Sequence, residues 1–195
     1  VGKALLCAKQ MQDLAPPSEQ PKVLRQLGEL TQTHGDPKGG MVLLEEALAM
    51  KKALHKGGDH ADVAALLQQL AHVLQALGLH AEAATHAEAS LAMLTRLHGD
   101  DRDDPSIAAA LHTLADLCQE QRRMDRAEFL LQREVAMRRR LHGDEDGKEV
   151  ASSLCSLASL YQAQGRQRTA EPLLTEALKM YRRLYSGCDH EDLVQ

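Results

Sequence analysis

Apolar and small side chains recur at helical spacing along this chain, and the same arrangement returns at a fixed interval. The clearest case is residues 146–187, where two successive amphipathic segments are separated by Gly165. One landmark position is held by Leu27, Leu70, Leu114 and Leu157, which are 43, 44 and 43 residues apart. Self-similarity at a period of this length indicates a repeat architecture. The pattern therefore predicts a linear array of two-helix units rather than one globular core.

The array is expected to hold four full repeats and two partial ones. Residues 1–15 are interpreted as the second helix of a truncated repeat, and residues 188–195 as the start of a further one. The full repeats are expected at residues 16–57, 58–100, 101–143 and 144–187, the first being the most divergent. A unit of about 40 residues buries too little surface to offset the entropy of ordering it, so neighbours must stack. We expect the chain to be a fragment of a longer protein.

Proline and glycine mark where the helices begin and end. Asp36-Pro37 and Asp104-Pro105 each place an N-cap residue before a proline at the first helical position. Pro21 suits the first turn of an earlier helix, where its missing N–H costs nothing. The recurring His-Gly at 98–99 and 142–143 is interpreted as a helix end with a left-handed glycine cap.

Composition agrees with an all-α fold. Hydrophobic residues make up 44% of the chain, yet Trp is absent, Phe occurs once and Tyr three times, which suits close helix packing rather than a sheet. A net charge of −5 gives no reason to expect nucleic acid or a bilayer as partner. No apolar run approaches the roughly 20 residues that span a membrane, so no membrane insertion is expected. The four cysteines show no paired spacing and favour free thiols in a reducing, cytoplasmic compartment.

The order of residues within one unit resembles the tetratricopeptide repeat. Residues 144–187 carry the pattern as Leu154, Leu157-Ala158, Tyr161, Gly165 and Ala170. The units are longer than the common 34 residues of this repeat. With Leu-His-Gly-Asp tails and an Ala-Glu-Pro-Leu start to the second helix, they are similar to the long repeats of kinesin light chains and nephrocystin-3-like proteins. The resemblance implies a right-handed α–α superhelix, a non-enzymatic adaptor or scaffold, and cytoskeleton or cilium association.

Four positions depart from the repeat pattern. Gly40 stands where the other units have Ala, Arg122 where they have Gly, Thr31 where an apolar residue is usual, and Glu134 where a small one is usual. The Asn-Asn pair that kinesin light chains carry before Leu-Ala is also absent.

The resemblance implies that the first helices line a concave groove, which is expected to bind a protein or peptide ligand. Its side chains are mostly amides and hydroxyls, which both donate and accept hydrogen bonds and so match a peptide backbone. The expected groove residues are Arg25, Gln26, Glu29, Gln32, Gln68, Gln69, His72, Gln75, His112, Thr113, Asp116, Gln119, Ser152, Cys155, Ser156, Ser159 and Gln162. The alternative explanation of these polar side chains is that any solvent-exposed helix face is polar. The alternative is a structural or oligomerisation segment with no separate peptide ligand, with self-association through exposed terminal half-repeats.

His112, Asp116 and Cys155 could together build a metal site or a Cys–His–Asp nucleophile. The simpler interpretation of the same residues is a surface His–Asp pair and a small groove residue. Because no HExxH or CxxC frame and no oxyanion site accompany them, we expect no metal, no cofactor and no catalytic residue.

Charged residues gather at helix ends. Arg138-Arg139-Arg140 and Arg182-Arg183 lie near the ends of second helices, which suits the helix dipole. Acids precede or open first helices: Asp59, Asp62, Asp103, Asp104 and Glu149. The alternative is that the ridge of Arg138 to Arg140 binds an acidic peptide or phosphate.

Overall fold

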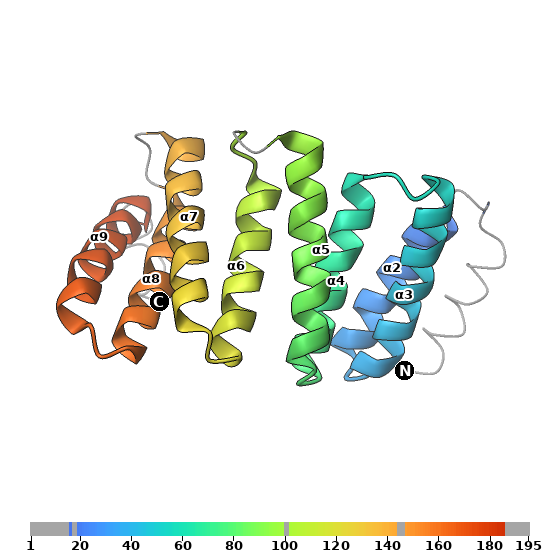
Figure 1. The fold of residues 1–195 in the computed structure, drawn as a ribbon, viewed down its shortest axis with the longest axis horizontal. Helices are drawn as coiled ribbons and strands as arrows, with labels where there is room; N and C mark the ends of the chain where they lie inside the picture. Colours follow the sequence, from blue (N-terminus) through green and yellow to red (C-terminus); the bar gives the residue numbers. More distant parts are fainter. Residues whose placement is uncertain (1–15, 17–18, 100–101, 144–146, 186–195) are drawn as a thin grey trace, which may run out of the picture. The chain divides into compact units, whose positions relative to one another are not determined.

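The computed structural model describes residues 16, 19–99, 102–143 and 147–185. Within these residues the chain forms eight α-helices and no strand (Figure 1). The helix expected within residues 1–15 and the repeat start expected at 188–195 lie outside the described residues. The chain divides into two compact units, Val1–Asp100 and Asp101–Gln195, each taken by itself.

The described part of the first unit holds two antiparallel helix pairs. Its helices are α2 (Gln20–Thr33), α3 (Pro37–Leu54), α4 (Ala61–Ala76) and α5 (His80–His98). Helix α2 packs on α3 and α4 on α5, while α3 packs on α4 and so joins the pairs.

The second unit repeats this arrangement. Its helices are α6 (Pro105–Glu120), α7 (Met124–His142), α8 (Lys148–Ala163) and α9 (Gln167–Tyr185). Here α7 packs on α8 and joins the two pairs. The order of packing in both units is the order along the chain, as nearest-neighbour stacking requires.

The expected caps are present at two helix starts. The Asp36 carboxylate accepts a hydrogen bond from the Gly39 N–H, and Pro37 follows in the first turn of α3. Asp104 accepts from the Ser106 N–H in the same way, with Pro105 opening α6. These side chains satisfy amides that no helical carbonyl can reach, which confirms the Asp-Pro prediction.

The landmark leucines all lie in the core, which confirms the helical register. Leu27, Leu70, Leu114 and Leu157 are at most 5% exposed. In the first unit the core is formed by α2, α3 and α4 side chains such as Leu24, Leu44 and Val63, all fully buried. Within each unit the repeats contribute the same face, so stacking joins apolar stripes that are too small to fold alone.

Each intra-repeat turn closes with the same backbone hydrogen bonds. In the fourth repeat the Gly165 N–H donates to the Gln162 carbonyl and the Arg166 N–H to the Tyr161 carbonyl, at 2.9 and 2.8 Å. Glycine occupies this turn at Gly35, Gly78 and Gly165, with φ of +85°, +77° and +75°. The third repeat places Arg122 there with φ of +60°, so a non-glycine residue adopts the left-handed conformation that the turn demands.

The departures in the first repeat belong to one close contact between α2 and α3. The buried Thr31 hydroxyl donates to the Gly28 carbonyl at 2.9 Å. A Cβ on Gly40 would lie 2.8 Å from that carbonyl oxygen and 2.9 Å from the Thr31 hydroxyl. The helices therefore approach more closely than an Ala would allow, and Gly40 and Thr31 fit each other.

Candidate functional site

In the first unit the expected groove residues lie on α2 and α4. Gln26, Glu29 and His72 are exposed. The other members are half-buried: Arg25, Gln32, Gln68, Gln69 and Gln75. Leu27 and Leu70 beside them are buried. The landmark leucines and their polar neighbours therefore lie on different faces of the helices, as the helical period requires.

A contact between α2 and α4 brings three of these residues together. The Gln69 side-chain amide donates to the Glu29 carboxylate across a separation of 40 residues. Glu29 also lies 3.6 Å from the Arg25 Nε atom, a long ion pair. The Arg25 Nε and the Gln69 Oε1 are both shielded from solvent and have no hydrogen-bond partner. Neighbouring repeats thus share a polar cluster that holds one unpaired donor and one unpaired acceptor.

The second unit presents its expected groove residues on α6 and α8. Ser152, Ser159 and Gln162 are exposed. The half-buried members are His112, Asp116, Gln119, Cys155 and Ser156. Thr113 differs from the expectation because its side chain is 4% exposed and its hydroxyl donates to the Ala109 carbonyl. It faces inward because, one residue before Leu114, it lies at the edge of the buried face of α6.

Glu134 of α7 is fully buried and holds a polar network together. The His112 Nδ1 lies 3.0 Å from one Glu134 oxygen, and the Arg138 guanidinium lies 3.0 Å from the other. The Ser153 hydroxyl of α8 also donates to this carboxylate, at 2.8 Å. A buried carboxylate is stable only when it is paired and hydrogen-bonded, and here three helices supply the partners.

This network alters the pKa of His112. The hydrogen bond with Glu134 raises the pKa of His112, while partial burial acts in the opposite direction. Asp116 adds to the rise from 3.6 Å away on the same helix, so the expected His112–Asp116 pair is present. The departure at Glu134 was visible in the sequence, but its link to His112 was not, because the two residues lie on different helices.

The structure does not support a metal site built from His112, Asp116 and Cys155. In the part of the chain that the structure describes, these residues do not form a group of three ligands close enough to share a metal ion. His112 instead directs its ring nitrogens to Glu134 and Asp116. Cys155 is a half-buried thiol.

The arginine ridge on α7 is already engaged within the unit. Arg138 donates to the Glu149 carbonyl at 3.0 Å, in addition to its contact with Glu134. Arg139 binds Glu176 of α9 and Arg140 binds Asp103 before α6. A phosphate or acidic peptide would have to displace these carboxylates, which argues against the ridge as an anion site.

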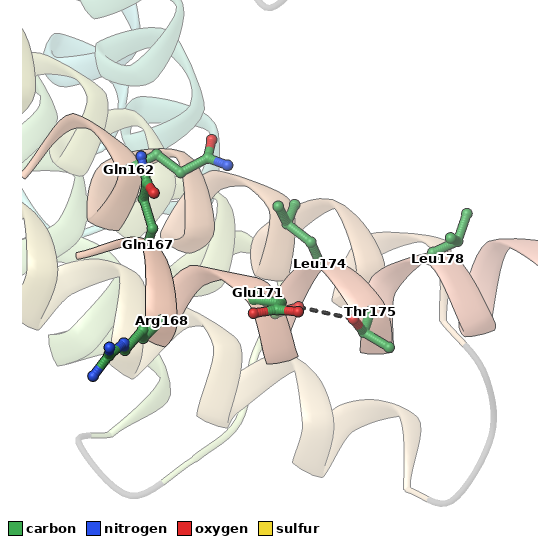
Figure 2. Close-up of a pocket in the computed structure, with 7 residues that line it drawn as sticks. All are labelled: Gln162, Gln167, Arg168, Glu171, Leu174, Thr175 and Leu178. Carbon is green, nitrogen blue, oxygen red and sulfur yellow. Dashed lines mark hydrogen bonds between the residues drawn. The ribbon is translucent and has the colours of Figure 1, made fainter. Parts of the chain in front are cut away.

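A shallow hollow of about 580 Å³ lies along α9 and the end of α8 (Figure 2). Its lining mixes polar and apolar side chains: Gln162, Gln167, Arg168, Glu171, Leu174, Thr175 and Leu178. Leu178 is 49% exposed, whereas Val135, at the same place one repeat earlier on α7, is 6% exposed because α8 packs against that helix. Figure 2 shows Leu174 and Leu178 projecting from one side of α9. This face of α9 corresponds to the face that α7 uses for stacking.

The family model described as tetratricopeptide repeat matches residues 62–140 and 106–183, together more than half of the chain. The chain belongs to the tetratricopeptide repeat family. No curated protein matches it in sequence. No helix in the described parts of this repeat protein is long and apolar enough to cross a membrane.

Solved structures of repeat proteins share its fold. It is similar to BtubC (BKLC) from P. vanneervenii, with a TM-score of 0.78 and 22% identity over 92% of this chain and 69% of the other. It is similar to a kinesin light chain-like protein of nearly identical TPR-like repeats from Podosopora anserina, with a TM-score of 0.76 and 24% identity over 94% and 88%. It is also similar to a Rap protein complexed with competence and sporulation factor, with a TM-score of 0.70 and 17% identity over 85% of this chain and 44% of the other. The tetratricopeptide solenoid class and the likeness to kinesin light chain repeats are thereby confirmed.

Proposed function

We propose that this repeat protein is a non-enzymatic scaffold that binds a peptide segment of a partner protein along its first helices. The tetratricopeptide fold supports a protein-interaction scaffold in general. The Rap protein of similar fold is complexed with competence and sporulation factor, which supports a bound ligand on this architecture. Fold alone does not define a ligand site, so the proposal rests on the side chains of α2 and α4.

The observation that carries the proposal is the cluster of Arg25, Glu29 and Gln69. Arg25 Nε is a donor without an acceptor, and Gln69 Oε1 is an acceptor without a donor. An unpaired, shielded polar atom costs about 1–3 kcal/mol. A peptide backbone offers both a carbonyl and an N–H, so one residue of a ligand would satisfy both atoms.

Access to the two shielded atoms would require the Arg25 and Glu29 side chains to separate. Arg25 and Glu29 are separated by 3.6 Å and are 39% and 47% exposed, so their attraction is weak and solvent-screened. A ligand carbonyl that approaches the Arg25 guanidinium displaces little existing bonding. The exposed Gln26 and His72 lie on the same two helices and would extend the contact.

The test is a selection of peptides from a displayed library on the whole chain, followed by titration of the selected peptide. Gln69→Ala and Arg25→Ala should each weaken binding by about tenfold, which corresponds to one hydrogen bond to a charged or shielded group. Glu45→Ala, an exposed position on α3, is the matched control and should leave the affinity unchanged. Equal affinity for all three variants would exclude this surface.

The second candidate is a structural or oligomerisation segment without a peptide ligand, and the exposed face of α9 favours it. Leu174 and Leu178 lie where Leu131 and Val135 of α7 are buried by a following helix. An amphipathic helix of repeat type from a second copy of this chain would cover them in the same way.

Sedimentation equilibrium separates the two candidates. Concentration-dependent dimerisation that Leu178→Glu abolishes, with the affinity for the selected peptide unchanged, would favour association through α9. A monomer at all concentrations, with peptide binding that depends on Gln69, would favour the scaffold.

A further inference from the structure

The connection between α3 and α4 brings two imidazoles and one carboxylate together. His55 directly follows α3, His60 caps the start of α4, and Asp62 lies in the first turn of α4. One donor atom from each of the three residues lies within 4.8 Å of the other two. His55 holds the place of the recurring helix-end His98 and His142, whereas His60 caps α4 where Asp104 caps α6, a role that commoner residues serve.

The backbone of the connection produces this proximity. Lys56 and Gly57 both have positive φ, at +53° and +74°, and the Gly58 N–H donates to the His55 carbonyl at 2.9 Å. The chain therefore reverses within a few residues and returns His60 beside His55. Their rings stack with centroids 3.6 Å apart and planes inclined by 15°.

His55 presents a nitrogen that nothing in the fold uses. Its Nε2 is shielded from solvent and has no hydrogen-bond partner. The neutral ring has an unshared pair on one nitrogen, which is the form that binds metal ions.

We propose that His55, His60 and Asp62 form a binding site for a divalent transition-metal ion, with Zn²⁺ as the matching ion. Two imidazole nitrogens and one carboxylate oxygen are a usual donor set for zinc, and harder ions such as Mg²⁺ prefer oxygen alone. Three protein ligands leave a fourth position open to water or to a ligand from a partner.

Binding requires a small rearrangement that the connection can provide. Tetrahedral zinc with bonds of about 2.0–2.1 Å places its donors about 3.3 Å apart. The donors must therefore draw in from separations of up to 4.8 Å. The stacked rings must also rotate, because the lone pair of an imidazole lies in its ring plane and parallel planes do not converge. Both rings are only half-buried, and Gly57 and Gly58 leave the backbone between them adaptable.

Two existing contacts oppose the ion. The His60 Nδ1 accepts the Asp62 N–H at 3.1 Å, and a ligating Nε2 would need the tautomer that gives up this bond. Lys51 Nζ lies 2.6 Å from Asp62 Oδ2 and brings a positive charge beside the site. Removing Lys51 should therefore strengthen metal binding, which is a result that adventitious binding elsewhere would not produce.

Occupation would join neighbouring repeats. His55 belongs to the end of α3 in the first repeat, whereas His60 and Asp62 belong to the start of α4 in the second. A shared ion would cross-link the two helices at their junction, which is the contact through which these repeats stack.

The experiment is calorimetric titration of Zn²⁺ into the whole chain, with Co²⁺ absorption as a spectroscopic measure of tetrahedral coordination. We expect one site per chain and visible Co²⁺ bands. His55→Ala and His60→Asn should each weaken Zn²⁺ binding by more than about tenfold. Asn keeps an N-cap on α4, so the second variant removes the ligand without removing the cap. Lys51→Met should tighten binding.

The matched controls are His34→Ala and Cys155→Ser, which remove other metal-binding side chains and should leave the affinity unchanged. Helicity of every variant is checked by circular dichroism. Unchanged Zn²⁺ affinity in both His55→Ala and His60→Asn would overturn the site, as would affinity lost in Cys155→Ser. Absence of one-to-one binding in the wild-type chain would do the same.

Discussion

Arg140, in the last turn of α7, forms a bidentate ion pair with Asp103, which lies just before α6. The Arg140 Nε is 3.0 and 2.9 Å from the two carboxylate oxygens, and its Nη2 is 2.7 Å from Oδ1. Arg96 binds Asp59 in the same way one repeat earlier, again 37 residues away. Each pair joins the C-terminal end of the second helix of a repeat to the residues just before the first helix of the same repeat. Planar, two-point pairing of this kind needs arginine rather than lysine.

The ion pair should be visible in the titration of Asp103. Its hydrogen bond with Arg140 lowers the pKa of Asp103 below the ordinary value of 3.8. The pairing therefore contributes stability above that value and loses it as pH falls through the lowered folded pKa. In Arg140→Gln the pKa of Asp103 should rise, measured by NMR on side-chain carboxyl carbons. An unchanged Asp103 titration would show that the pair does not persist in solution.

Arg122→Gly should stabilise the chain. Arg122 holds φ of +60° in the turn where Gly35, Gly78 and Gly165 occur in the other repeats. A left-handed non-glycine residue costs about 1–2 kcal/mol, part of which is offset because Gly adds entropy to the unfolded chain. We expect a net gain of about 0.5–1 kcal/mol in urea unfolding. The reciprocal change, Gly165→Ala, should destabilise the chain by a similar amount. A loss of stability in both Arg122→Gly and Gly165→Ala would contradict this account.

Gly40→Ala should destabilise the first unit although Ala is the better helix former. Helix propensity alone favours the substitution by about 1 kcal/mol. The added Cβ would however lie 2.8 Å from the Gly28 carbonyl oxygen, a backbone atom that cannot turn away. Overpacking of this kind costs about 1–3 kcal/mol, so the net change is an unfavourable one of up to about 2 kcal/mol. A raised melting temperature in Gly40→Ala would mean that α2 and α3 separate without penalty.

Glu134→Gln should destabilise the second unit by about 3 kcal/mol. The substitution removes the negative charge but leaves Arg138, whose side chain is only 16% exposed, without its carboxylate. Breaking a buried pair by changing one partner leaves the other charge uncompensated. Glu171→Gln on the exposed side of α9 is the control and should change little. Equal urea midpoints for the two variants would refute a structural role for the buried network.

The stability of the second unit should fall from pH 6 to pH 9 through His112. Its pKa is raised above 6.5, first by the hydrogen bond with Glu134. The contribution is thus complete below 6.5 and is lost as pH rises through the folded pKa. Glu134 and Asp116 favour the charged ring, whereas Arg138 opposes it. In His112→Gln this part of the pH dependence should disappear. A wild-type profile retained in that variant would assign the dependence to another group.

Local signals in the sequence were sufficient for the helices but not for the polar contacts between them. Asp36-Pro37 and Asp104-Pro105 are local caps, and each forms as expected because all its atoms lie within one turn. Asp103 was interpreted as favouring a helix dipole, yet it binds an arginine 37 residues away. In both pairs the arginine follows its aspartate by 37 residues, Arg96 after Asp59 and Arg140 after Asp103. This spacing was present in the sequence and could have revealed the pairs, because residues at equivalent positions of a repeat have equivalent spatial neighbours.

The candidate surface shows the same division. Gln68 and Gln69 could be assigned outside the buried stripe of α4 from their position beside Leu70, and both are half-buried, whereas burial of Thr113 depends on how α6 packs within its unit. The meeting of His55 and His60 depends on the left-handed turn at Lys56 and Gly57.

By itself the sequence determined the class of this protein, because a period of 43 to 44 residues and a buried stripe every 3.6 residues are properties of the chain alone. It determined the helix ends wherever a cap is made by neighbouring residues. Only the tertiary structure decided which charges meet, that Glu134 is paired rather than exposed, and which histidines lie together. The reason is physical: helix formation depends on contacts within four residues, whereas ion pairs and polar clusters depend on the distance between helices, which packing sets.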